Sequence, residues 1–110
     1  MDLIFYGLTT CDASRKAQKA LTAAGHDLNV IDVRADGVPR ADLARLFDIF
    51  GEDLVNRRST TWRGLSDAER VRDPLDLLAE HPTLMKRPVI LAGDAAYLGW
   101  SKQAQAALAP

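Results

Sequence analysis

The stretch LIFYGLTTCDASRKAQKALTAAG, residues 3–25, decides how this chain folds. Its first four residues are apolar or aromatic and lead into Gly7, which predicts a buried strand followed by a loop. Residues 12–24 are strong helix formers with apolar side chains at helical spacing, and Gly25 stands where a helix commonly ends. The stretch therefore predicts a strand, a short loop and a helix in direct succession.

The neighbouring sequence extends this pattern in both halves of the chain. Residues 28–33 alternate apolar and polar side chains, which predicts a second strand and, with the first helix, a right-handed βαβ unit. Near the other end, residues 89–92 and 96–98 flank a turn at Gly93-Asp94 and predict a β-hairpin. Ser101 then provides the cap of a final helix.

The middle of the chain reads as helical. An apolar stripe at i, i+3, i+4 and i+7 predicts an amphipathic helix, a capping box predicts a second helix start, and an Asp-Pro pair predicts a third. The residues that carry these signals are Leu43, Leu46, Phe47 and Phe50, then Ser66 with Glu69, then Asp73 with Pro74. The order β-α-β, helices, β-β-α predicts an α/β, thioredoxin-like fold with a mixed four-stranded sheet. We expect one domain over residues 1–110, with a helical insertion at about residues 38–82.

Composition limits the classes of function. The 110 residues carry 14 Lys+Arg and 15 Asp+Glu, a formal net charge of -1, so neither direct nucleic-acid binding nor membrane-surface binding is expected. No apolar run approaches the ~20 residues of a membrane span, and no signal peptide is evident, so we expect a cytoplasmic protein. Cys11 is the only cysteine and His26 and His81 are far apart, which predicts neither a disulfide nor a metal site.

Cys11 is the first candidate for chemistry. It lies at the predicted start of a helix, where free N–H groups and the positive end of the helix dipole favour a thiolate. Ser14 and Arg15 follow at three and four residues, so both fall on the helix face that Cys11 occupies. The alternative is that Cys11 is a small buried apolar residue, a common role for a single cysteine.

Two further segments are candidates for binding an anion. Arg87-Pro88 precedes the predicted strand at residues 89–92, and a proline there marks the rim of a sheet. Arg57 and Arg58 lie in an arginine-, hydroxyl- and tryptophan-containing segment, residues 56–63, able to bind an anion through planar donors. An exposed charge at a strand entrance and a solvated loop are the alternatives. Whether the peptide bond before Pro88 is cis cannot be read from the sequence.

Two related chemistries are excluded by single positions. A phosphatase-type loop needs an arginine six residues after its cysteine, and residue 17 is alanine. A self-contained dithiol reductase needs a second cysteine, and Ser14 stands where it would be. Any catalytic cycle at Cys11 must therefore use a thiol from another molecule.

Four motifs in order resemble the ArsC-like family, which comprises glutaredoxin-coupled arsenate reductases, Spx-type transcription regulators and short YffB-type thiol reductases. They are TCDASRKA at residues 10–17, RSTTWR at 58–63, KRP at 86–88 and LGWS at 98–101. The resemblance spans nearly the whole chain and is closest to the YffB-type branch.

The resemblance implies that Cys11 is the nucleophile and that Ser14, Arg15 and Arg87 surround it. In the arsenate reductases the cysteine attacks arsenate, glutathione forms a mixed disulfide and glutaredoxin restores the thiol. Here Asn56 stands where those enzymes carry an arginine, and Lys102 is the nearest cation to a second such position, which argues against arsenate as the natural substrate.

The main hypothesis is thus a glutathione-dependent thiol reductase with Cys11, Ser14 and Arg87 as catalytic residues. Its substrate or anion is expected to be bound by a second set: Arg15, Arg57, Arg58 and Pro88. We expect no bound cofactor or metal. We expect glutathione as co-substrate and partner, with a glutaredoxin as a candidate further partner. The alternative is a non-enzymatic, Spx-like regulatory module that binds RNA polymerase. The missing second cysteine favours the reductase, because redox-switched members of that branch carry a pair.

Overall fold

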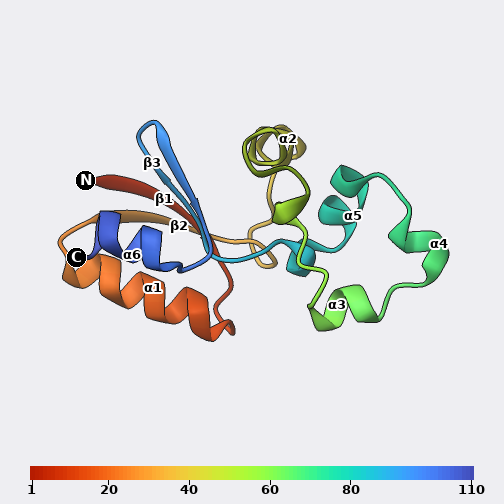
Figure 1. Cartoon of the computed structure of the whole chain (residues 1–110), viewed down its shortest axis with the longest axis horizontal. Helices are drawn as coiled ribbons and strands as arrows, with labels where there is room; N and C mark the ends of the chain where they lie inside the picture. Colours follow the sequence, from red (N-terminus) through yellow and green to blue (C-terminus); the bar gives the residue numbers. More distant parts are fainter. The chain divides into compact units, whose positions relative to one another are not determined.

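Segments from both ends of the chain build the first of two compact units. The computed structural model describes all residues 1–110, and these divide into one unit of residues 1–36 with 87–110 and a second of residues 37–86. The first unit is a four-stranded sheet with two helices that lie along one of its faces (Figure 1). Its elements are β1 (Asp2–Gly7), α1 (Asp12–Ala23), β2 (Asp27–Asp32), β3 (Val89–Ala92), β4 (Ala95–Leu98) and α6 (Lys102–Leu108).

The strand order β2-β1-β3-β4 places β1 inside the sheet. β1 runs parallel to β2, with Gly7 opposite Asp32, and antiparallel to β3, with Tyr6 opposite Val89. β3 and β4 form the hairpin that the glycine turn predicted. As a result, the last residues of β1 and β2 and the first residues of β3 lie next to one another at the same end of these strands.

The core of this unit forms between the helices and the sheet face they cover. Phe5, Ala17, Leu21 and Ile90 are fully buried in it and Leu108 nearly so. The alternation of β1 explains this face, because Leu3 and Phe5 point the same way while their neighbours point to the other side. The helix periodicity explains the partner face, since Ala17 and Leu21 are four residues apart.

The second unit consists of short helices. It contains α2 (Arg40–Phe50), η1 (Gly51–Leu54), α3 (Thr60–Arg63), α4 (Asp67–Arg70), α5 (Pro74–Glu80) and η2 (Pro82–Leu84), where η denotes a 3-10 helix. Helix α2 packs against α5, and the buried side chains include Leu46, Leu54, Leu77 and Leu84. No helix in the protein has both the length and the apolar character needed to span a bilayer.

The predicted fold class is confirmed: the protein has a thioredoxin-like α/β fold with one four-stranded sheet. In the sequence, the helices of the second unit stand between the β-α-β segment and the β-β-α segment. The capping box at Ser66 and the N-terminal cap at Asp73 are both present. Helix α3 and the two 3-10 helices were not predicted. Each spans four residues or fewer, too short for a periodic pattern to be recognised.

The burial of Leu21 makes a prediction about stability. Leu21→Ala removes a fully buried side chain from the interface between α1 and the sheet, so we expect the free energy of unfolding to fall by about 2–5 kcal/mol. Thr22→Ala, at the next and exposed position of α1, is the control and should change it by about 0.5 kcal/mol or less. Urea unfolding followed by circular dichroism measures both. Equal effects would mean that α1 does not pack on the sheet as described.

Candidate active site

The sheet edge at the end of β1 gathers the residues around Cys11. Cys11 ends the loop that follows β1 and is the N-cap of α1, with a half-buried side chain. Because Tyr6 pairs with Val89, the two residues before β3, Arg87 and Pro88, enter the sheet beside this loop. The topology thus brings together two motifs that are 76 positions apart in the sequence.

A tight turn carries the cysteine. The N–H of Cys11 donates to the carbonyl oxygen of Leu8 at 2.9 Å, which closes a four-residue turn. Cys11 has an extended backbone (φ -91, ψ 120), and its own carbonyl accepts the first hydrogen bond of α1, from Arg15 N–H at 3.0 Å. The sulfur therefore lies at the positive end of the helix, where a negative charge is stabilised.

Ser14 connects this turn to the sulfur. Its side chain is buried, with an exposed fraction of 2%, and the N–H of Leu8 donates to its Oγ at 3.2 Å. Because Leu8 occupies an acceptor position on the oxygen, the hydroxyl proton is directed to another acceptor, and Ser14 donates to Cys11 Sγ. A buried serine with both partners satisfied has one orientation, which suits a group that must hold a thiolate.

These contacts change the acidity of the thiol. Burial raises the pKa of Cys11, but hydrogen bonding from Ser14, by hydroxyl and then by backbone N–H, and the hydrogen bond and charge of Arg87 together outweigh it. The net effect is a pKa below the ordinary value of a cysteine. These contacts therefore favour the thiolate form of Cys11.

The other predicted residues of this unit are placed as follows. Arg15 is exposed and forms an ion pair with Asp12. Pro88 is buried, the peptide bond between Arg87 and Pro88 is cis, and Pro88 accepts a hydrogen bond from Gly99 N–H at 2.7 Å. Of the predicted set, Ser14 and Arg87 are the residues that the structure brings to the sulfur.

Arg57 and Arg58 belong to the second unit. Both are exposed and line a cavity of about 540 Å³ that also contains Lys86, together with the carboxylates of Glu52 and Asp53. The guanidinium of Arg57 lies 5.3 Å from the ring centre of Trp62, and 3.7 Å separates it from Glu52. The cavity therefore combines cationic and anionic side chains.

Two contributors to the site were not identified from the sequence. Gly7 leaves no room for a side chain: a Cβ there would lie 2.6 Å from Phe5 Cε1 and 3.2 Å from Ser14 Oγ. Asp32 accepts hydrogen bonds from Thr9 in the loop before Cys11. For Gly7, the sequence does hold a local signal, since it directly follows the apolar run of a predicted strand. The second has no local signal, because its partner is 23 residues away.

The fold and the site define a thioredoxin-like protein with one activated cysteine at a helix start. A solved structure of the bacterial redoxin NrdH from Escherichia coli has the same fold, with a TM-score of 0.51 and 20% identity over all of this chain and 97% of that chain. A model of the ArsC family matches residues 6–108. The chain belongs to the ArsC family.

Relatives match over nearly their full length. An uncharacterised protein from Haemophilus influenzae is 43% identical over 112 residues, covering 94% of this chain and 96% of the relative. The solved structure of a YffB protein has a TM-score of 0.89 and 28% identity, covering 98% and 99% of the two chains. An arsenate reductase-related protein from Brucella melitensis has a TM-score of 0.74 and 29% identity, covering 96% and 93%. The resemblance to the ArsC and YffB-type proteins is therefore confirmed.

The contacts of Sγ predict that Arg87→Ala and Ser14→Ala each raise the pKa of Cys11, since each removes a donor that stabilises the thiolate. The rate of alkylation by iodoacetamide against pH measures this pKa, and its midpoint should move to higher pH. Arg15→Ala is the control for loss of a nearby arginine and should leave the midpoint in place, because Asp12 already pairs with that guanidinium. If the midpoint moved with Arg15→Ala and not with Arg87→Ala, the charge that stabilises the thiolate would come from Arg15, which would contradict the prediction.

The tight space at Gly7 predicts that Gly7→Ala both destabilises the protein and raises the pKa of Cys11. The new methyl group would push Phe5 and Ser14 apart, at a cost of about 1–3 kcal/mol in the free energy of unfolding. Gly64→Ala is the matched control, because a Cβ there meets only ordinary contacts at 3.5 Å or more. Thermal unfolding and the alkylation profile test the pair, and a normal profile for Gly7→Ala would separate Gly7 from the site.

Proposed function

We propose that this protein is a glutathione-dependent thiol reductase that uses Cys11 as its single nucleophile. The observation that carries the proposal is the lowered pKa of a half-buried thiol, held by Ser14 and Arg87 at the start of α1. The relation to a protein described as arsenate reductase-related, from Brucella melitensis, supports the same class of chemistry. The described residues include no cluster of His, Cys, Asp and Glu able to hold a metal ion.

The first step is attack of the Cys11 thiolate on the glutathione sulfur of a mixed disulfide. A bond forms between Cys11 Sγ and that sulfur while the sulfur–sulfur bond of the substrate breaks, and the substrate leaves as a thiolate that takes a proton from water. Ser14 and Arg87 keep Cys11 ionised before the attack. The protein is then glutathionylated on Cys11.

The second step uses another thiol, because the chain has no second cysteine. A glutathione thiolate attacks the sulfur of the bound glutathione, releases oxidised glutathione and restores the Cys11 thiolate. Over the cycle, one mixed disulfide is reduced by one molecule of glutathione, which itself ends in the disulfide. A glutaredoxin is an alternative supplier of this thiol. The chemistry belongs to the cytoplasm, where glutathione is kept reduced.

Recognition of glutathione is proposed for groups of the first unit that lie near Cys11. The backbone beside Pro88, at the start of β3, is suited to pair with the cysteinyl amide of the tripeptide in the manner of an added strand. The exposed guanidinium of Arg15 is able to bind one of its carboxylates in a bidentate manner, in exchange for its ion pair with Asp12. The exposed guanidinium groups of Arg57 and Arg58 are proposed separately, as anion-binding groups of the second unit. The oxyanion alternative, arsenate, is disfavoured by Asn56 in place of an arginine.

Incubation with oxidised glutathione at neutral pH followed by mass spectrometry tests the proposal. We expect one glutathione on Cys11, formed faster in the folded protein than in the urea-unfolded chain, because the folded site holds more thiolate. Excess reduced glutathione should remove the adduct. A folded protein slower than its own unfolded chain would contradict the proposal, and retention of RNA polymerase subunits without adduct formation would favour the regulatory module instead.

A further inference from the structure

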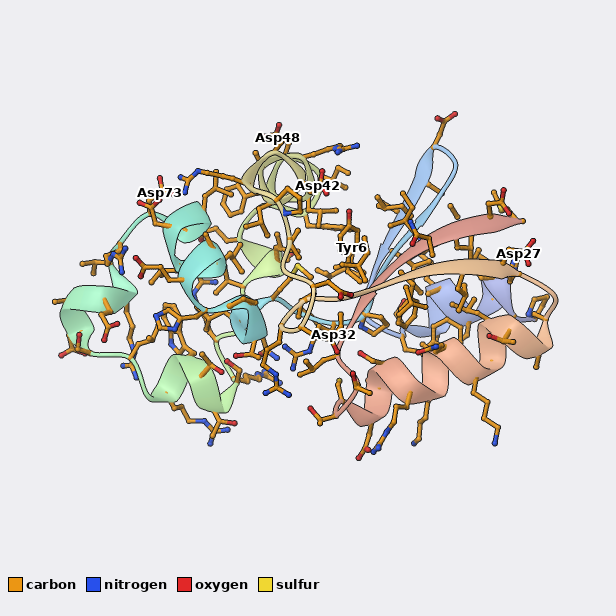
Figure 2. All side chains as sticks on the ribbon, turned by 180° about the vertical axis from the view of Figure 1, so that it is seen from behind. Tyr6, Asp27, Asp32, Asp42, Asp48 and Asp73 are labelled. Atoms are coloured by element: carbon orange, nitrogen blue, oxygen red, sulfur yellow. The ribbon has the colours of Figure 1, made fainter.

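The loop that presents Cys11 is held at two successive residues. Leu8, the first residue of the turn, is anchored by Ser14 as described above. Thr9, the second, is anchored from outside the β1–α1 segment: its N–H and its hydroxyl both donate to Asp32 Oδ2, at 3.2 and 2.5 Å. Figure 2 shows Asp32 where β2 ends, beside the loop that leads from β1 into α1.

Asp32 is itself held in place by the turn that follows β2. Its other carboxylate oxygen, Oδ1, accepts hydrogen bonds from the N–H groups of Arg34 and Ala35 at 2.9 and 2.8 Å. Its own N–H donates to Asp36 Oδ2 at 2.8 Å. The carboxylate therefore has four donors divided between its two oxygens, two from the turn and two from Thr9. Such an acceptor is fixed in position before it contacts the cysteine loop.

We infer that Asp32 is a positioning residue for Cys11, which acts through Thr9 by fixing the turn that carries the nucleophile. Strand pairing supports this assignment, because Gly7 and Asp32 are opposite one another at the ends of parallel strands and Val33 N–H donates to Gly7 at 2.9 Å. The pairing of β1 with β2 fixes the position of the Asp32 carboxylate, and this carboxylate in turn fixes the position of Thr9. The assignment rests on the proposed function, since it concerns the same sulfur.

The hydrogen bonds explain why the carboxylate remains ionised. The N–H of Ala35 and the hydroxyl of Thr9, followed by weaker contributions, lower the pKa of Asp32 well below its usual range despite a small opposing effect of burial. Asp32 is thus a permanent anion at any pH where Cys11 reacts. Its contacts with Thr9 link it to the loop that carries Cys11, which is the geometric connection that the assignment uses.

The sign of one measurement separates a positioning role from a charge effect. Removing a nearby negative charge would lower the pKa of Cys11, because a thiolate would then face less repulsion. Releasing the turn would raise that pKa, because Ser14 and Arg87 would no longer meet the sulfur in a fixed geometry. We expect Asp32→Ala to raise the alkylation midpoint and to reduce the alkylation rate at pH 7 by about threefold to tenfold, as follows from a smaller thiolate fraction.

Variants of Thr9 test the same contact with little risk to folding. Thr9→Val removes the hydroxyl donor at nearly constant shape, whereas Thr9→Ser keeps it, so the midpoint should rise for valine and return to that of the natural protein for serine. Asp36→Ala is the control for a loosened turn, since it removes the acceptor of Asp32 N–H but no bond to Thr9. It should lower stability and move the midpoint less than Asp32→Ala does, because both bonds to Thr9 remain.

The outcomes distinguish the two proposals. An unchanged or lowered midpoint in both Asp32→Ala and Thr9→Val would overturn the positioning role, as would an equal rise in Asp36→Ala. If the natural protein has a low Cys11 pKa that Asp32 and Thr9 control, yet forms no adduct with oxidised glutathione, the proposed function fails and the positioning role stands.

Discussion

The site depends on the hydrogen bonds of the Ser14 hydroxyl. This group accepts a hydrogen bond from Leu8 N–H and donates to Cys11 Sγ, so one buried oxygen links the start of the turn to the sulfur at its end. Burial gives the contact its strength, because no water competes for the hydroxyl when only 2% of the residue is exposed. The same burial makes a missing partner costly, which keeps the turn and the helix together.

Gly7 and the core of the first unit make this contact possible. The backbone of β1 passes so close to Ser14 and the ring of Phe5 that no larger residue fits at position 7. Phe5 in turn belongs to the core that α1 forms with the sheet. The geometry around the sulfur is therefore an extension of core packing, and a change in the core is transmitted to the thiol through Ser14.

Arg87 supplies the positive charge that the start of α1 lacks. The N-terminus of α1 carries an acidic residue, Asp12, in its first turn, and Arg15 is engaged with that carboxylate, so the nearest cation along the helix is already neutralised. The positive charge felt by Cys11 comes instead from the other end of the chain. A position at a helix start does not by itself make a cysteine reactive. The feature that distinguishes Cys11 is the nearby charge of Arg87, a residue distant in the sequence.

The amino-acid sequence by itself determined the strands, the longer helices and the position of Cys11 at a helix start. These features follow from periodicities of two and of 3.6 and from capping residues such as Ser66 and Asp73, all of which act over a few neighbouring positions. The short helix α3 was missed because four residues form no period.

Only the tertiary structure decided which charged and polar side chains meet the sulfur. The sequence offered Arg87 as a catalytic residue and Arg15 as a binding residue, and strand pairing between β1 and β3 brings Arg87 to Cys11. It gave no indication of Asp32, because the bond to Thr9 depends on two parallel strands ending in register. Sheet register is a long-range property, since it is set by packing a whole face against the core rather than by any local pattern.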